Sequence, residues 1–117
     1  PELACTGLTE EAAQRVGKAY DVGVFPLAAN GRALIMNGGN GVIKVLVGKT
    51  HREILGVHIY GPRATDLISE ACLAVGMEAT SDEVLATIHG HPTLGEALRE
   101  AVLAAEGRAV HLPPAKE

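Results

Sequence analysis

The sequence lacks the features that nucleic-acid-binding and membrane-spanning proteins need. It has no tryptophan, and aromatic residues make up 3% of its 117 residues, so few rings are available to stack on bases. Its net charge of −4 provides no basic surface for a phosphate backbone. No apolar run approaches the roughly 20 residues that cross a bilayer, and we expect no signal peptide. We therefore expect neither a nucleic acid nor a membrane as a partner.

Cysteine is also scarce. Cys5 and Cys72 are the two cysteines of the sequence, and their wide separation matches neither a metal-binding motif nor a redox motif. Because free cysteines usually behave as small hydrophobic residues, we expect both to be reduced and buried. Reduced thiols are typical of a reducing compartment, which makes the cytoplasm the expected location.

The residues that are present are typical of one soluble globular domain. Hydrophobic residues make up 47% of the sequence and charged residues 21%, so the core is expected to consist of Ala, Val, Leu and Ile. The length suits a single domain, which we assign to residues 1–107, followed by a loose tail over 108–117. Because a strand-like alternation begins almost at Pro1, with no Met before it, we expect a piece of a longer chain.

The first half of the sequence alternates between apolar and polar residues, which is the pattern of β-strands. Thr9 and Gly17 are suited to begin and end a short helix, and Pro26 favours a sheet edge. Residues 29–40 are rich in turn-forming types and hold at most one helical turn. The expected elements are a strand over 1–8 with Leu3, Cys5 and Gly7 on one face, a helix over 9–17, a strand over 20–29, and a hairpin of strands 41–48 and 53–60.

After Pro62 the apolar period changes from two residues to about 3.6, which predicts helices over 63–77, 80–88 and 93–107. Strands followed by helices imply an α+β fold, with an antiparallel β-sheet and helices packed on one side. The helix over 63–77 is apolar around so much of its circumference that we expect its second face to meet another chain.

The stretch "IHGHPTLGEALREA", residues 88–101, contains the candidate functional side chains. One alternative is a metal site, because His89, His91 and Glu96 have the H-x-H-x4-E spacing of the first cupin metal motif. That motif lies on strands and carries flanking glycines, whereas Glu96 lies on a predicted helix. The next histidine, His111, lies far along in the predicted tail. We therefore expect no metal here.

Two further alternatives remain open. Thr93 and Glu96 have the spacing of a helix capping box, in which the histidines would be incidental loop residues. Alternatively, because helical side chains tilt toward the N-terminus, Glu96 would point at His91 and orient its imidazole for proton transfer. Nothing in the sequence resembles an activated Ser or Cys nucleophile, so the group that such a base serves would lie outside this chain.

The longer stretch "TIHGHPTLGEALREA" resembles the C-terminal signature of the dihydrolipoamide dehydrogenases, a branch of the pyridine nucleotide–disulfide oxidoreductase family. Three other stretches are similar to that family in the same order: "PELACTGLTEEAA", "FPLAANGRAL" and "EILGVHIYGPRATDLISEACLAV". The resemblance covers essentially the whole chain, and it implies the interface, or dimerisation, domain of such an enzyme.

The resemblance assigns roles to individual residues. In that family the histidine directly before the proline is the acid/base, held by the glutamate five residues later. This implies that His91 is the catalytic acid/base, that Glu96 orients it, and that His91 exchanges protons with active-site thiols of the partner subunit. His89 and Pro92 are implied to shape the loop, with His89 marking the dihydrolipoamide branch, and Thr93 is expected to support the site as the helix cap. We expect the His91–Pro92 peptide bond to be cis.

The resemblance also implies parts that this sequence lacks. The family's redox pair is C-x4-C, and no such spacing occurs here. No G-x-G-x-x-G follows a strand, and the "NGGNG" at 37–41 precedes no predicted helix. We therefore expect the FAD and NAD domains to be absent, and the fragment alone to bind no cofactor and to be inactive.

In the parent enzyme, the resemblance implies NAD-dependent oxidation of dihydrolipoamide. The implied partners are a second copy of the chain, in a homodimer formed through helix 63–77 and the region 88–95, and the dihydrolipoyl acyltransferase of a 2-oxo acid dehydrogenase complex. Two other functions are considered: a stand-alone dimerisation or scaffold module without chemistry, and the interface domain of another disulfide reductase of the family.

Overall fold

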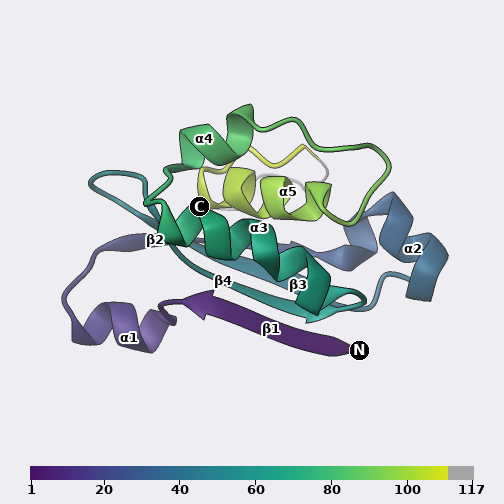
Figure 1. Cartoon of the computed structure of the whole chain (residues 1–117), viewed down its shortest axis with the longest axis horizontal. Coiled ribbons are helices and arrows are strands. Elements are labelled where there is room, and N and C mark those ends of the chain that lie inside the picture. Colours follow the sequence, from purple (N-terminus) through teal and green to yellow (C-terminus); the bar gives the residue numbers. More distant parts are fainter. Residues whose placement is uncertain (111–117) are drawn as a thin grey trace.

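A computed structural model describes residues 1–110, which contain one four-stranded antiparallel sheet with strand order β1-β4-β3-β2 (Figure 1). The elements in chain order are β1 (Glu2–Gly7), α1 (Glu10–Arg15), β2 (Tyr20–Pro26), the 3-10 turn η1 (Leu27–Ala29), α2 (Gly31–Asn37), β3 (Val42–Gly48), β4 (Ile54–Gly61), α3 (Ala64–Gly76), α4 (Ser81–Ala86) and α5 (Glu96–Ala105). Helices α3, α4 and α5 lie on one side of the sheet (Figure 1). The expected α+β fold is confirmed.

The core lies between the sheet and two helices that each cover half of it. Helix α3 packs over β1 and β4, and α5 packs over β2 and β3. Alternate strand residues such as Val45 and Val57 point into this layer and are fully buried. At Gly23 a Cβ would lie 1.9 Å from the carbonyl oxygen of Ala101, so only glycine lets α5 approach β2 this closely. This contact fixes the helix that begins at Glu96.

One short helix lies on the opposite face of the sheet. Ala13 of α1 packs there against Leu46 and Leu55 (Figure 1). Within residues 1–110 nothing covers the rest of this face, and Leu3 and Tyr60, which pair across β1 and β4, are exposed on it. The sheet therefore has one fully packed face and one that is packed only at the end under α1.

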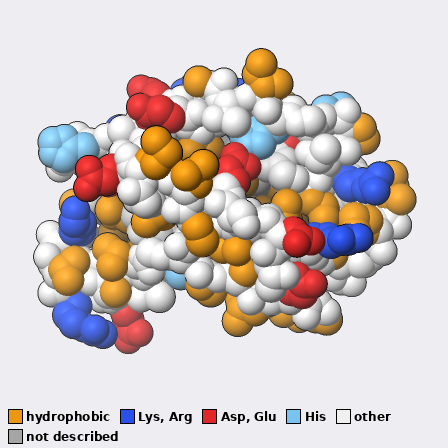
Figure 2. Space-filling view, in the orientation of Figure 1, with side chains coloured by type: hydrophobic (Ala, Val, Ile, Leu, Met, Phe, Trp, Pro, Cys, Tyr) orange, Lys and Arg blue, Asp and Glu red, His pale blue; other side chains and the backbone are white. Residues whose placement is uncertain are grey.

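The outer side of α3 carries exposed apolar side chains. Leu73 and Met77 are 63% and 72% exposed, and together with Ala74 and Val84 they line a hollow of about 410 Å³ between α3 and α4. Figure 2 shows hydrophobic side chains on this face of the molecule, with acidic side chains beside them. Apolar groups gathered in this way are typical of a surface that packs against another protein.

Both cysteines are exposed free thiols, so the expectation that they are buried is wrong. Cys5 pairs in register with His58 of β4, and it lies on the sheet face that α1 leaves largely open. Cys72 lies on α3 beside the exposed Leu73. The pattern of apolar residues identifies which side chains share a face, but it does not say which face the helices cover.

Two helices differ from the expected elements. Helix α2 has seven residues instead of at most one turn, because Asn30 caps its start and Gly38, with φ 73°, ends it in the left-handed conformation. Helix α5 begins at Glu96 and not at residue 93. The predicted tail is described only to residue 110, and residues 111–117, which include His111, lie outside the described part. No helix within 1–110 is long and apolar enough to cross a bilayer.

Candidate acid–base site

The loop between α4 and α5 carries the candidate residues, and Thr93 closes it onto α5. The Thr93 Oγ1 accepts a hydrogen bond from the Glu96 amide at 3.3 Å, and the Thr93 amide donates to Glu96 Oε1 at 3.4 Å. Thr93 Oγ1 also donates to the Gly90 carbonyl at 2.6 Å. These are the reciprocal contacts of a capping box between Thr93, which precedes the helix, and Glu96, its first residue.

The same carboxylate binds His91. Its Nδ1 lies 2.9 Å and 3.1 Å from the two carboxylate oxygens of Glu96. Capping and orientation of the histidine are therefore not exclusive alternatives, because Glu96 makes both sets of contacts. The His91–Pro92 peptide bond is cis, as expected.

The two members of this pair differ in exposure. The His91 side chain is 74% exposed, whereas that of Glu96 is 19% exposed. Among residues 1–110, no group hydrogen-bonds the Nε2 of His91. A carboxylate that accepts a hydrogen bond from Nδ1–H keeps the proton on Nδ1 and leaves Nε2 with a free lone pair. This imidazole can then take a proton from, or return one to, a group that approaches from outside.

His89 faces a different carboxylate. Its side chain is only 8% exposed, and its Nε2 lies 2.6 Å from Oε1 of Glu70 on α3. The buried Nδ1 has no hydrogen-bond partner within the described part of the chain. Because the two histidines bind separate carboxylates, they do not converge in the way that the cupin-like spacing would require. His89 instead fastens the loop to α3.

Asn30 fastens the other end of the loop. It is 4% exposed, and its Nδ2 donates to the Thr93 carbonyl at 3.0 Å, while its Oδ1 accepts from the Ala33 amide at 2.9 Å. Neither Asn30 nor Glu70 was among the residues that the sequence singled out. An asparagine ahead of a helix is a typical N-cap, which would have predicted the bond to Ala33. No local pattern could have predicted the contacts to Thr93 or to His89.

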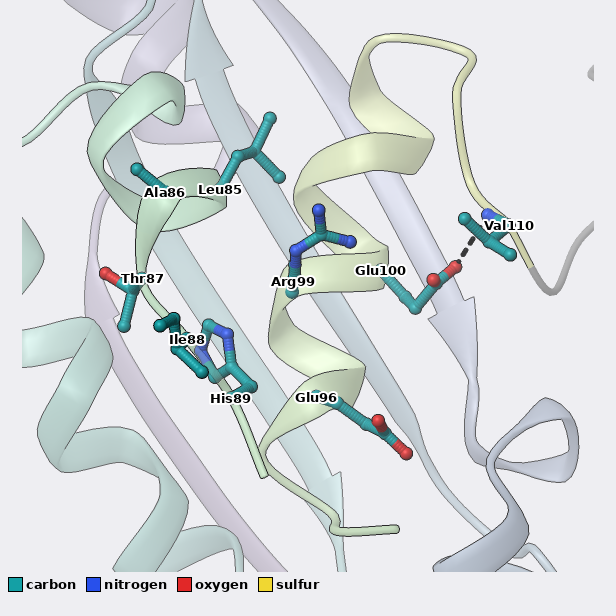
Figure 3. Close-up of a pocket in the computed structure, with 9 residues that line it drawn as sticks. All are labelled: Leu85, Ala86, Thr87, Ile88, His89, Glu96, Arg99, Glu100 and Val110. Atoms are coloured by element: carbon teal, nitrogen blue, oxygen red, sulfur yellow. Dashed lines mark hydrogen bonds between the residues drawn. The ribbon is translucent and has the colours of Figure 1, made fainter. Parts of the chain in front are cut away.

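A hollow of about 420 Å³ lies beside the loop (Figure 3). His89 lines it from the loop, Glu96 and Arg99 line it from α5, and Glu100 binds the Val110 amide at its edge. His91 is not among its lining residues. The exposed imidazole is therefore presented to the surroundings of the chain and not to this hollow.

The comparison with known families agrees with the sequence resemblance. The profile described as "Pyridine nucleotide-disulphide oxidoreductase, dimerisation domain" matches residues 1–102. The chain is 49% identical over 111 residues to the dihydrolipoyl dehydrogenase of Bacillus subtilis, and 47% identical over 112 residues to that of Thermus scotoductus. These matches cover 95% and 96% of this chain but 23% and 24% of the two relatives. The chain thus spans less than a quarter of their length.

Solved structures show the same fold. LpdA from Mycobacterium tuberculosis matches with a TM-score of 0.82 at 25% identity, covering 87% of this chain and 22% of that protein. The HOCl-induced flavoprotein disulfide reductase RclA from Escherichia coli matches with a TM-score of 0.80 at 27% identity, covering 86% of this chain and 23% of that protein. In both cases the similarity is confined to about one fifth of a larger protein.

Proposed function

This chain belongs to the dimerisation-domain family of the pyridine nucleotide–disulphide oxidoreductases, and from that premise we propose that it is the homodimerisation domain of a dihydrolipoyl (dihydrolipoamide) dehydrogenase. In this proposal it supplies His91 and Glu96 to the disulfide site of the partner subunit. The observation that supports it most strongly is the hydrogen bond between His91 Nδ1 and Glu96, which leaves an exposed Nε2. No reacting group of the described residues lies against this nitrogen, so the imidazole is suited to exchange a proton with a group of another subunit.

The proposed chemistry is thiol–disulfide exchange assisted by one base. His91 Nε2 takes the proton from one thiol of dihydrolipoamide, and the resulting thiolate attacks a sulfur of the enzyme disulfide and releases the other sulfur as a thiolate. The second substrate thiol gives its proton to this enzyme thiolate and attacks the substrate sulfur of the mixed disulfide, which closes the lipoamide disulfide and releases the second enzyme sulfur. That sulfur takes back the proton that His91 holds, so the enzyme disulfide is left as two thiols. Glu96 stabilises the imidazolium that forms and keeps Nε2 directed outward.

FAD and NAD would carry the two electrons onward from the reduced thiols in the parent enzyme. The glycine-rich segment of this chain does not fit the phosphates of either cofactor. The glycine-rich segment at 37–41 connects α2 to β3, so a strand and not a helix N-terminus follows it. We therefore place both cofactors outside this chain and infer that the isolated chain does not oxidise dihydrolipoamide.

The proposed partners follow from the same assignment. A second copy would pack on the outer side of α3, where Leu73 and Met77 are exposed, and near the loop 88–95. The dihydrolipoyl acyltransferase of a 2-oxo acid dehydrogenase complex would bind near the dimer axis. The cytoplasm is the proposed cellular location of the protein. A dimer placed in this way would bring the exposed His91 of one subunit toward the thiols of the other.

The test is a chimera in which this chain replaces the matching region of the Bacillus subtilis dihydrolipoyl dehydrogenase. We expect the chimera to turn over dihydrolipoamide, and we expect His91→Gln to lower kcat by about 10²- to 10⁴-fold while bound flavin is unchanged. The exposed His51 in the β3–β4 turn provides the control, because His51→Gln removes an imidazole remote from the loop.

Normal turnover in the His91→Gln chimera would refute the acid–base role. If that chimera also assembles normally, the result would favour the alternative of a dimerisation module without chemistry. A flavin absorption spectrum, or dihydrolipoamide oxidation, from the isolated 117-residue chain would contradict the assignment of both cofactors to other domains.

A further inference from the structure

We propose that Asn30 is a positioning residue for the His91–Glu96 pair. Its buried amide joins the start of α2 to the Thr93 carbonyl and so holds the loop in the conformation in which Glu96 meets His91. The catalytic consequence of this role rests on the proposed function, whereas the positioning itself is a property of this chain alone.

Asn30 is a fixed point from which to hold a loop. Its backbone amide donates to the Leu27 carbonyl at 2.9 Å, and the Leu27 amide in turn donates to Gly41 at 2.9 Å. Leu27, the first residue of η1 directly after β2, is fully buried, and Asn30 itself is 4% exposed. The backbone of Asn30 is therefore linked through Leu27 to the residue that precedes β3, and its Nδ2 reaches a carbonyl 63 residues further along the chain.

Helix capping alone does not require asparagine at this position. Asp, Ser and Thr cap helices about as well, because a cap needs only an oxygen that accepts from the helix amide. Asn30 makes that bond with Oδ1 and uses Nδ2 for a second bond, to Thr93. A donor and an acceptor on one short side chain are found in asparagine and not in aspartate. The donor is thus the part of Asn30 that acts on the loop.

Thr93 passes this restraint to the candidate pair. Its amide and its hydroxyl both contact Glu96, its hydroxyl also binds Gly90, and it follows His91 by two residues. A displacement of Thr93 would move the Glu96 carboxylate and the His91 backbone by different amounts. The 2.9 Å contact between His91 Nδ1 and Glu96 would then lengthen.

The first measurement uses the unaltered chain. We expect the Nδ2 protons of Asn30 to exchange with solvent at least about tenfold more slowly than those of Asn40, whose amide also binds a carbonyl, that of Asn37, but at the surface. Equal exchange rates for the two side-chain amides would overturn the proposal, because the bond to Thr93 would then not persist in solution.

The second measurement uses Asn30→Asp, which keeps the cap acceptor and removes the donor. We expect the ratio of the Nδ1–H tautomer of His91 to the Nε2–H tautomer to fall by about fivefold, as measured from its ¹⁵N spectrum at pH 8. A change of this size corresponds to the loss of one ordinary hydrogen bond. Thr9→Ala is the control for a general effect of weakening a helix start, since it removes the cap of α1, on the other face of the sheet. We expect it to leave the His91 spectrum unchanged.

An unchanged His91 tautomer in Asn30→Asp, or an equal change in Thr9→Ala, would show that Asn30 is only a helix cap.

In the chimera we expect Asn30→Asp to lower kcat severalfold with little change in KM, and Thr9→Ala to change neither. If Asn30→Asp shifts the tautomer while His91→Gln leaves turnover normal, the positioning role stands and the proposed function fails. If His91→Gln abolishes turnover but Asn30→Asp leaves the tautomer unchanged, the proposed function stands and the positioning role fails.

Discussion

At the scale of single residues, Glu96 is the side chain on which the candidate site depends. One of its carboxylate oxygens accepts a hydrogen bond from the Thr93 amide, and both oxygens lie within hydrogen-bond distance of His91 Nδ1. These interactions span three to five residues, so the sequence spacing was sufficient to predict them. The restraints from Glu70 and Asn30 span 19 and 63 residues, and they depend on how α3 and α2 pack against the loop. Local sequence patterns carry no information about such contacts.

The geometry at Glu96 predicts that Glu96→Gln, although it is the more conservative substitution, lowers kcat at least as much as Glu96→Ala. In Glu96→Gln, the amide oxygen would accept from the Thr93 amide, which leaves the NH₂ group facing His91 Nδ1. That NH₂ group would force Nδ1 to accept and would place the proton on Nε2, so the base would be blocked. We expect kcat of the chimera to fall by about 10²- to 10⁴-fold, at least as much as in Glu96→Ala. A Gln variant with near-normal kcat, or with the original tautomer in its ¹⁵N spectrum, would contradict this explanation.

At the scale of elements, periodicity predicted the strands, the hairpin and the helix over 80–88, and the structure shows that α4 begins with a capping box of Thr80 and Glu83. Burial was harder to predict, as the exposed cysteines show. The sequence also gave no indication of the polar cluster that joins the far ends of several elements. There Arg52, in the β3–β4 turn, binds Glu106 at the end of α5 at 3.1 Å, and Ser81 of α4 binds the same carboxylate oxygen at 2.8 Å.

This cluster predicts an acid-sensitive contribution to stability. Burial alone would raise the pKa of Glu106, but hydrogen bonds from Ser81 and Arg52 hold it below the ordinary value of 4.5. Since the folded pKa lies below the unfolded one, the stabilisation is complete above about pH 4.5 and is lost as the pH falls through the folded pKa.

We therefore expect Glu106→Gln to lower the free energy of unfolding at pH 7 by about 1–2 kcal/mol. Because glutamine does not titrate, the difference from the unaltered chain shrinks below pH 4.5. Urea unfolding at several pH values measures both effects, and Glu11→Gln on the exposed side of α1 serves as the control. A difference that stays constant from pH 7 to pH 3 would argue against a role for the Glu106 charge.

At the scale of the whole molecule, the chain forms a complete two-layer core but an incomplete candidate site. The α+β class followed from strands preceding helices, and the family resemblance extends over nearly the whole length. The surfaces that face other proteins are less readily predicted, because an exposed apolar side chain and a buried one have the same periodicity. Leu73 shows this, since it is one of the apolar residues of the predicted helix 63–77 and lies exposed on the outer side of α3.

The outer side of α3 predicts the oligomeric state. We expect the chain to be a dimer at micromolar concentration, and Leu73→Glu to make it monomeric with little loss of stability, because this side chain is already 63% exposed in the single chain. Ile35→Glu is the control, because Ile35 is 77% exposed but lies on α2. Light scattering that gives a monomer mass for the unaltered chain, or a dimer mass for both variants, would rule out this interface.

The central claim is that His91 acts on the thiols of another subunit, and mixed dimers test it most directly. One chimera carries His91→Gln, and a second keeps His91 but has serines in place of the C-x4-C redox pair that the family resemblance implies for the Bacillus subtilis portion. We expect neither chimera to turn over dihydrolipoamide appreciably on its own. In an equimolar mixture of subunits, half of the dimers are mixed and each has one intact site, so we expect about a quarter of the unaltered activity to return. No recovery in the mixed dimers would contradict the claim, because His91 and the thiols would then have to belong to the same subunit.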